Sequence, residues 1–240
     1  MDNLSKHQIA DYYNTYAKKQ INTGINIRHY HLFKKIIKAG LKKNHKILEI
    51  GCGIGTLTKL IHSYITNGYI VGVDISSENI RLATERFKKS KKCEFIVSDM
   101  TDFSYNGKFD FIILPDVLEH IPIEQHKNLF SVLSSITHEN SKIIINIPHP
   151  NAIDYLKNTY PSKLQIIDQS LHADWLVKLF YEGNFELLEY KTYSLIYIEN
   201  DYVYIALKKR TEKLILTTKK TSSIIINKFK KHIYFWFKTI

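Results

Sequence analysis

The sequence predicts an α/β protein built on a doubly wound, mostly parallel sheet of seven strands. Two observations point to this class. Short apolar runs alternate with helical segments along the chain, as expected for strand–helix–strand units. Several of these runs end in a carboxylate, and the first is followed by a glycine-rich turn. The 240 residues are enough for one domain with a sizeable core.

The first strand is predicted at residues 47–50 and contains Glu49. A tight turn follows, with glycine at every second position and one cysteine: Gly51, Cys52, Gly53 and Gly55. Glycine lets a ligand approach the backbone because no Cβ stands in the way. A carboxylate directly before the turn would repel a pyrophosphate. It therefore distinguishes this turn from the dinucleotide-binding fingerprint and favours a cationic ligand.

Further strands are predicted at residues 69–74, 93–99, 109–114 and 142–148. The first of these ends in Asp74 and the second in Asp99. Three acids at successive strand ends, separated by helical segments, are hard to obtain by chance. A final hairpin is predicted over residues 185–197 and 202–208, and it supplies an antiparallel last strand.

These motifs resemble the class I S-adenosylmethionine-dependent methyltransferases over roughly residues 47–207. The E-x-G-x-G-x-G turn is similar to the family's first motif, whose ligand carries an ammonium and a sulfonium. The resemblance implies that Asp74 holds both ribose hydroxyls, Ile75 flanks the adenine, Asp99 meets its amino group and Met100 packs on the ring. It also assigns cofactor contacts to the glycine turn, to Pro115 and to Tyr16.

The first 40 residues are predicted to be helical. Residues 7–19 hold Tyr12, Tyr13 and Tyr16, and a second helix is expected over residues 26–39. The resemblance implies a lid that closes these tyrosines over the sulfonium or the acceptor. The alternative is that they are half-buried aromatic residues on a helix face.

A possible metal site follows the fourth strand, where Asp116, Glu119 and His120 share one face of a helical turn. In many family members this stretch simply begins a helix. In the small-RNA 2′-O-methyltransferases and the ubiquinone-pathway O-methyltransferases, a similar stretch holds a divalent ion that positions two vicinal hydroxyls. Mg²⁺ or another divalent metal would then be bound with His149 as a further ligand.

A hydroxyl acceptor without a metal needs a base, because its proton must leave as the methyl group arrives. His149 is the first candidate, since it follows strand five at the carboxyl edge of the sheet and imidazole titrates near neutral pH. His172 and His120 are the next candidates. Residues 151–180 are expected to form a substrate-side insertion whose polar and aromatic content fits carbohydrates and phenols alike.

Most of the net charge of +11 lies at the C-terminus. From Lys208 onward ten Lys and Arg oppose one Glu, so that segment carries +9 and the preceding residues +2. The nearly neutral body argues against a nucleic-acid substrate. Residues 211–240 are predicted to form a basic amphipathic tail, with three alternatives: peripheral contact with an anionic membrane, docking on protein or a homodimer partner, or nucleic-acid contact.

The sequence thus predicts three segments: a helical lid (1–40), a cofactor-binding domain (41–207) and a basic tail (208–240). Cys52 and Cys93 fit a reducing compartment, and no signal peptide or membrane-spanning run is visible, so a cytoplasmic protein is expected, with contact at the inner face of the membrane as an option. The abundance of Ile, Lys and Asn indicates an AT-rich bacterial genome.

The predicted function is O-methylation of a hydroxyl on a sugar, glycan or lipid-linked intermediate, with S-adenosylmethionine as donor, S-adenosylhomocysteine as product and a histidine as general base. Three alternatives stay open. They are metal-assisted methylation of a vicinal diol (a catechol-type molecule or an RNA 3′-terminal ribose), N-methylation, and a non-catalytic scaffold that binds the cofactor.

Overall fold

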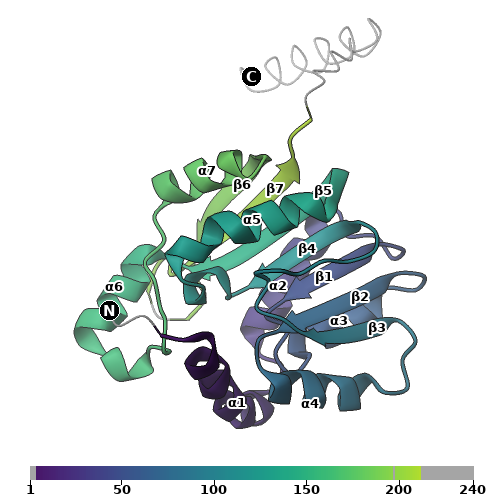
Figure 1. Cartoon of the computed structure of the whole chain (residues 1–240). Helices are drawn as coiled ribbons and strands as arrows, with labels where there is room; N and C mark the ends of the chain where they lie inside the picture. Colours follow the sequence, from purple (N-terminus) through teal and green to yellow (C-terminus); the bar gives the residue numbers. More distant parts are fainter. Residues whose placement is uncertain (1–3, 197, 212–240) are drawn as a thin grey trace, which may run out of the picture. The chain divides into compact units, whose positions relative to one another are not determined.

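The computed structural model describes residues 4–196 and 198–211. Its centre is a seven-stranded sheet of order β3-β2-β1-β4-β5-β7-β6 (Figure 1). The strands are β1 (Lys46–Ile50), β2 (Tyr69–Asp74), β3 (Cys93–Val97), β4 (Phe109–Pro115), β5 (Thr137–Pro148), β6 (Phe185–Tyr193) and β7 (Tyr202–Lys209). Only β7 runs antiparallel to both of its neighbours, which confirms the predicted antiparallel last strand.

Helices cover both faces of the sheet, as Figure 1 shows, with α5 and α7 in front of it and α2 and α3 behind. The helices are α1 (Lys6–Thr23), α2 (Ile27–Lys38), α3 (Thr56–Tyr64), α4 (Ser77–Phe87), α5 (His126–Ser135), α6 (Pro150–Thr159) and α7 (Ala173–Glu182), and the short 3₁₀ turns are η1 (Leu118–His120), η2 (Ile123–Gln125) and η3 (Pro161–Lys163). The doubly wound α/β class predicted from the sequence is confirmed.

The central strands are apolar without alternation because both of their faces are covered. In β4, for example, residues 111–114 are all fully buried. Side chains of one face pack with Leu129, Phe130 and Phe180 of α5 and α7. Those of the other face pack with Leu32 and Ile61 of α2 and α3. The rigid sheet fixes where the carboxyl ends of its strands lie.

Helix α1 lies at the carboxyl ends of the parallel strands, beside α4 (Figure 1). It begins at a capping box formed by Ser5 and Gln8 and buries Ile9 and Ala17. The Asn14 side chain accepts hydrogen bonds from Ser76 Oγ (2.7 Å) and from the backbone N–H of Glu78 (3.2 Å) at the start of α4. These contacts hold α1 across the end of the sheet, where the predicted lid was placed.

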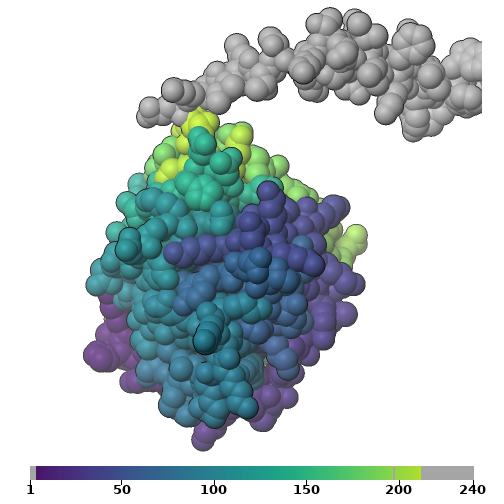
Figure 2. All heavy atoms as spheres, turned by 90° about the vertical axis from the view of Figure 1, so that its right-hand side faces the viewer, coloured from purple at the N-terminus to yellow at the C-terminus, as the bar shows by residue number. Residues whose placement is uncertain are grey.

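The face over the β3 edge is formed largely by the first half of the sequence, coloured purple to teal in Figure 2. In the part of the chain that the structure describes, no helix is long and apolar enough to cross a membrane. The predicted amphipathic tail lies outside the described residues from position 212 onward, and Tyr197 of the predicted hairpin lies outside them as well.

Candidate active site

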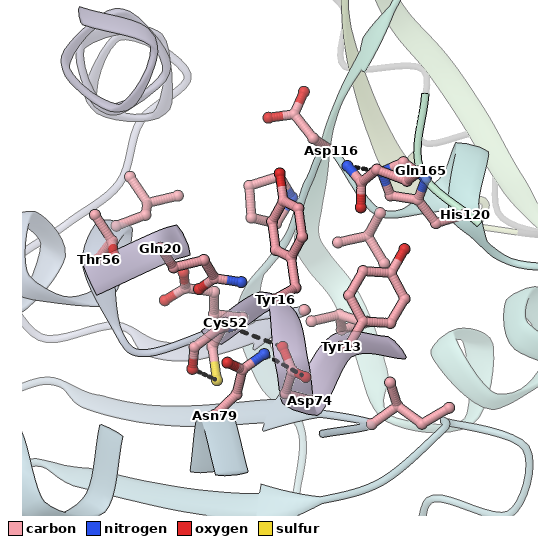
Figure 3. Close-up of a pocket in the computed structure, with 18 of the residues that line it drawn as sticks. Tyr13, Tyr16, Gln20, Cys52, Thr56, Asp74, Asn79, Asp116, His120 and Gln165 are labelled. Atoms are coloured by element: carbon pink, nitrogen blue, oxygen red, sulfur yellow. Dashed lines mark hydrogen bonds between the residues drawn. The ribbon is translucent and has the colours of Figure 1, made fainter. Parts of the chain in front are cut away.

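A cavity of about 250 Å³ lies between α1 and the carboxyl ends of β1, β2 and β4. Ten of the eleven residues that the sequence assigned to the cofactor line it: Tyr16, Glu49, Gly51, Cys52, Gly53, Asp74, Ile75, Asp99, Met100 and Pro115. The exception is Gly55, which is absent from the lining. In Figure 3, Cys52 of the glycine turn and Asp74 lie on one side of the cavity, and His120, Gln165 and Asp116 lie on the other.

The backbone of the glycine turn is in the left-handed region at Gly51, Gly53 and Gly55, and a side chain at each position would meet a different neighbour. Gly51 has φ of +67°, and a Cβ there would overlap the Val117 side chain. At Gly53 a Cβ would overlap the Gln20 carboxamide of α1, whose Oε1 accepts the Ile54 N–H at 3.2 Å. Gly55 instead lies at the start of α3 against Phe87, which explains why it does not reach the cavity.

Asp74 organises this turn from the end of β2. Its Oδ2 accepts the backbone N–H of Gly53 at 2.8 Å, and its Oδ1 accepts from Ser76 N–H at 2.9 Å and Asn79 Nδ2 at 3.1 Å (Figure 3). Burial raises the pKa of Asp74, while these hydrogen bonds lower it. A carboxylate has about four lone-pair positions, so the group retains acceptor capacity toward the cavity.

Glu49 sits at the end of β1 with only 1% of its surface exposed. Its Oε2 accepts from Thr58 Oγ1 at 2.6 Å, whereas Oε1 has no partner among the described residues. Burial raises the pKa of Glu49 to about 8. A buried carboxylate oxygen without a donor is costly, and it indicates that a ligand supplies the missing donor.

The third acid, Asp99, closes the cavity on the side of β3. Lys6 of α1 pairs with it at 2.5 Å, and Thr101 donates to it through Oγ1 at 2.6 Å. The next residue, Met100, is buried with φ of +66°. An apolar side chain and an acid therefore lie together at this end of the cavity.

At the opposite end Asp116 is held between two donors. Arg28 of α2 pairs with its Oδ2 at 3.0 Å, and Asn146 Nδ2 donates to its Oδ1 at 3.1 Å. Burial raises the pKa of Asp116, and the Arg28 charge lowers it. Asp116 follows β4 with φ of +55°, a left-handed conformation that non-glycine residues adopt infrequently.

His120 is fixed by the loop that follows η3. Its Nδ1 lies 2.6 Å from the carbonyl oxygen of Ile167 and 3.2 Å from Asp168 Oδ1, and its Nε2 lies 3.1 Å from the Gln165 amide. Burial lowers the pKa of His120, but Glu119 and Asp168 outweigh it and raise the pKa to about 9. Both ring nitrogens of His120 are thus engaged, Nδ1 by Ile167 and Asp168 and Nε2 by Gln165, so His120 is a poor general base, contrary to the sequence prediction.

The other two candidate bases are not brought to the cavity. His149 is the N-cap of α6, and its Nδ1 accepts the Asn151 N–H at 3.2 Å. His172 occupies the corresponding position before α7. Neither side chain lines the cavity. The prediction that one of them is the base is not supported, because each belongs to the start of the helix that follows it.

The predicted metal ligands do not converge either. Within residues 4–196 and 198–211, no three His, Cys, Asp or Glu side chains are grouped so that they could hold an ion. Asp116 is engaged by Arg28, and His149 lies at the start of α6. Glu119 is buried, its Oε1 lies 3.8 Å from His120 Nε2, neither carboxylate oxygen has a hydrogen-bond partner among the described residues, and burial raises its pKa. The residues present do not fit the four-ligand site.

Sequence reasoning missed several cavity residues. Gln20, Arg28 and Gln165 come from α1, α2 and the loop after η3, and Tyr13 was named only as one of three lid tyrosines. Asp168, which positions His120, was not assigned a role. No local motif marks these residues, since only the folded arrangement brings their segments together.

Comparison with known proteins agrees with this architecture. Residues 47–140 match the family model described as a methyltransferase domain. The chain is 31% identical over 109 residues to malonyl-[acyl-carrier protein] O-methyltransferase 1 of Ilyobacter polytropus, covering 45% of this chain and 40% of the relative. It is 35% identical over 80 residues to the ubiquinone biosynthesis O-methyltransferase of Pelagibacter ubique, covering 33% and 32%. The chain thus spans less than two thirds of the length of the curated relatives it matches.

The fold is also shared with solved structures. Magnesium protoporphyrin IX methyltransferase from Synechocystis, with bound S-adenosylhomocysteine, superposes with a TM-score of 0.65 at 18% identity, covering 86% of this chain and 99% of that one. The same enzyme with bound S-adenosylmethionine gives a TM-score of 0.64 at 17% identity, covering 88% and 100%. Residues 47–140 thus carry a methyltransferase domain, and the chain shares the fold of solved S-adenosylmethionine-dependent methyltransferases, as the motifs predicted.

Proposed function

We propose that this chain transfers a methyl group from S-adenosylmethionine to an oxygen atom of a small-molecule acceptor. One observation carries the proposal. Glu49 and Asp74, at the ends of two neighbouring parallel strands, line one cavity together with the glycine turn. Carboxylates at this position favour a ligand with cationic and hydroxyl donors over a phosphate.

The residues present fit this cofactor. Glu49 offers a buried oxygen that lacks a donor, Asp74 retains acceptor capacity, and the glycines at 51 and 53 leave the backbone accessible. Ile75 and Met100 supply apolar surface beside Asp99. When bound, S-adenosylmethionine supplies an electrophilic methyl group. The protein holds the two reactants in line, which is a proximity effect and needs no covalent enzyme intermediate.

An oxygen acceptor is favoured over an amine by the hydrogen-bond donors at the other end of the cavity. Arg28 and Tyr13 both line that end, and the Tyr13 hydroxyl has no partner among the described residues. An oxygen atom supplies lone pairs to such donors, whereas a protonated amine supplies none. The sugar, glycan or lipid-linked acceptor predicted from the sequence was motivated by the tail, which lies outside the described residues from position 212 onward. Of its three candidate histidine bases, only His120 lines the cavity.

Calorimetry with S-adenosylmethionine and S-adenosylhomocysteine tests the cofactor site. Asp74→Asn should weaken both affinities by about tenfold to a hundredfold, because hydrogen bonds to a charged group are lost. Asp102→Asn, which removes an exposed carboxylate outside the cavity, is the matched control and should change neither affinity. Equal affinities for wild type and Asp74→Asn would contradict the assignment. Tight binding without S-adenosylhomocysteine formation on any acceptor would favour the scaffold alternative.

A further inference from the structure

The phenol hydroxyl of Tyr13 lies at the acceptor end of the cavity without a partner. Tyr13 projects from α1 and lines the cavity, and its ring centroid is 6.2 Å from that of His120 (Figure 3). Among the described residues nothing accepts or donates a hydrogen bond at this buried oxygen. Burial raises the pKa of Tyr13, so the group remains an O–H donor. A buried donor aimed into a cavity indicates a ligand atom that accepts from it.

Arg28 presents a second donor at the same end. Its guanidinium has five N–H groups, more than the contacts to Asp116 and Tyr202 use, and Arg28 lines the cavity. Asp116 neutralises and orients Arg28, and both Asp116 oxygens are already engaged, one by Arg28 and one by Asn146. The carboxylate therefore fixes the cation in place.

The two histidines at this end also present protons. His29 Nδ1 accepts the Asn26 N–H at 3.2 Å, which places the His29 proton on Nε2. His120 Nδ1 faces the Ile167 carbonyl and the Asp168 carboxylate, two acceptors, so it must carry a proton. The acceptor end is thus rich in proton-bearing groups, and neither histidine is disposed to take a proton from a hydroxyl.

Building on the proposed function, we propose that the methyl acceptor is a carboxylic acid, bound as its carboxylate by Arg28 and the Tyr13 hydroxyl and released as a methyl ester. A carboxylate supplies the lone pairs that these donors lack. The planar guanidinium of Arg28, in α2, has the geometry to donate two parallel hydrogen bonds to a carboxylate. The Tyr13 hydroxyl, in α1, adds one further donor.

The reaction balances without a base. A carboxylate oxygen forms the new O–CH₃ bond as the S–CH₃ bond breaks, and the electron pair of that bond stays on sulfur. An anion and a sulfonium become a neutral ester and a neutral thioether, and no proton is released. In the described part of the chain, His29 Nδ1 already accepts the Asn26 N–H and His120 Nε2 faces the Gln165 amide, so neither histidine of the acceptor end has a nitrogen open to accept one.

Binding to the protein saturated with S-adenosylhomocysteine tests this inference with defined probes. The probes are benzoate and hexanoate, with benzamide, benzyl alcohol, hexanamide and hexanol as neutral partners of the same skeletons. We expect wild type to bind each carboxylate at least tenfold more tightly than its neutral partners. Tyr13→Phe should weaken carboxylate binding about tenfold. Its thermal stability should be unchanged or higher, because the lost hydroxyl had no partner.

Tyr12→Phe is the matched control, since Tyr12 neighbours Tyr13 in α1 but does not line the cavity. Arg28→Gln alone leaves Asp116 buried and unpaired, so the second variant is the double substitution Arg28→Gln with Asp116→Asn, which removes both charges together. This variant should abolish the preference for carboxylates.

Three outcomes would overturn the inference: no preference for the carboxylates in wild type, a preference that survives both variants, or an alcohol methylated as readily as its acid. Methyl esters are recognised by release of methanol in mild base, which ethers and N-methyl products resist. If S-adenosylhomocysteine itself does not bind, the proposed function fails. If it binds and the carboxylate preference is absent, the acceptor class alone is wrong.

Discussion

The two ends of the cavity are assembled in different ways. The cofactor end comes mainly from one continuous segment, residues 49–53, and from the residues that end or follow β2 and β3. The acceptor end is built from Tyr13, Arg28, His120 and Gln165, which belong to four segments far apart in the sequence. A contiguous motif is visible in a sequence, whereas a convergence of distant side chains is not.

The ends also differ in their polar groups. Glu49, Asp74 and Asp99 line the cofactor end, whereas the acceptor end holds Arg28, which is paired with Asp116, and the unpartnered hydroxyl of Tyr13. The contrast shows that the acceptor end depends on side chains that α1 and α2 bring to the cavity, which no single motif contains.

The largest expected effect is at the glycine turn. Gly51→Ala adds a Cβ that overlaps Val117 at a residue with φ of +67°, so backbone strain and steric overlap act together. Calorimetry should show S-adenosylmethionine binding weakened by about a hundredfold or more. Gly107→Ala is the control, because it carries similar backbone strain (φ of +114°) at a residue that does not line the cavity. Equal losses in the two variants would show that strain alone is responsible.

A smaller effect is expected when a contact that supports the acceptor end from outside the cavity is removed. Asp168 contacts His120 and accepts the Gln165 N–H, but it does not line the cavity. Asp168→Asn should lower the free energy of unfolding in urea by about 2 kcal/mol, since a buried charge-assisted contact is lost. S-adenosylmethionine affinity should stay within twofold of wild type. A parallel loss of cofactor affinity would show that the two ends are not independent.

The smallest effect concerns protons at the cofactor end. With a pKa of about 8, Glu49 is mostly protonated at pH 7 in the free protein, and a bound ammonium favours its ionised form. Binding should therefore release about 0.9 proton at pH 7, measured by calorimetry in buffers of different ionisation enthalpy. Affinity should rise about tenfold from pH 6 to pH 7, the direction expected when the ligand binds the deprotonated form. Glu49→Gln should show neither proton release nor this slope.

Local sequence was enough for the sheet and for the residues that follow its strands. The apolar runs at 47–50 and 69–74 became β1 and β2, and Glu49, Asp74 and Met100 reached the cavity as expected. His149 and His172 show where the same reasoning fails. His149 does follow β5, but the helix that begins directly after it sets the direction of its side chain, and His172 is placed in the same way before α7.

The sequence by itself determined the fold class and the residues that line the glycine-turn side of the cavity, because strands, turns and their terminal acids are specified by neighbouring residues. Only the tertiary structure decided which groups line the acceptor end. Arg28 is oriented by Asp116, which Asn146 holds in turn, and His120 Nδ1 faces Asp168 from a loop 48 positions later. Burial and long-range pairing set charge and direction, and neither is written in local sequence.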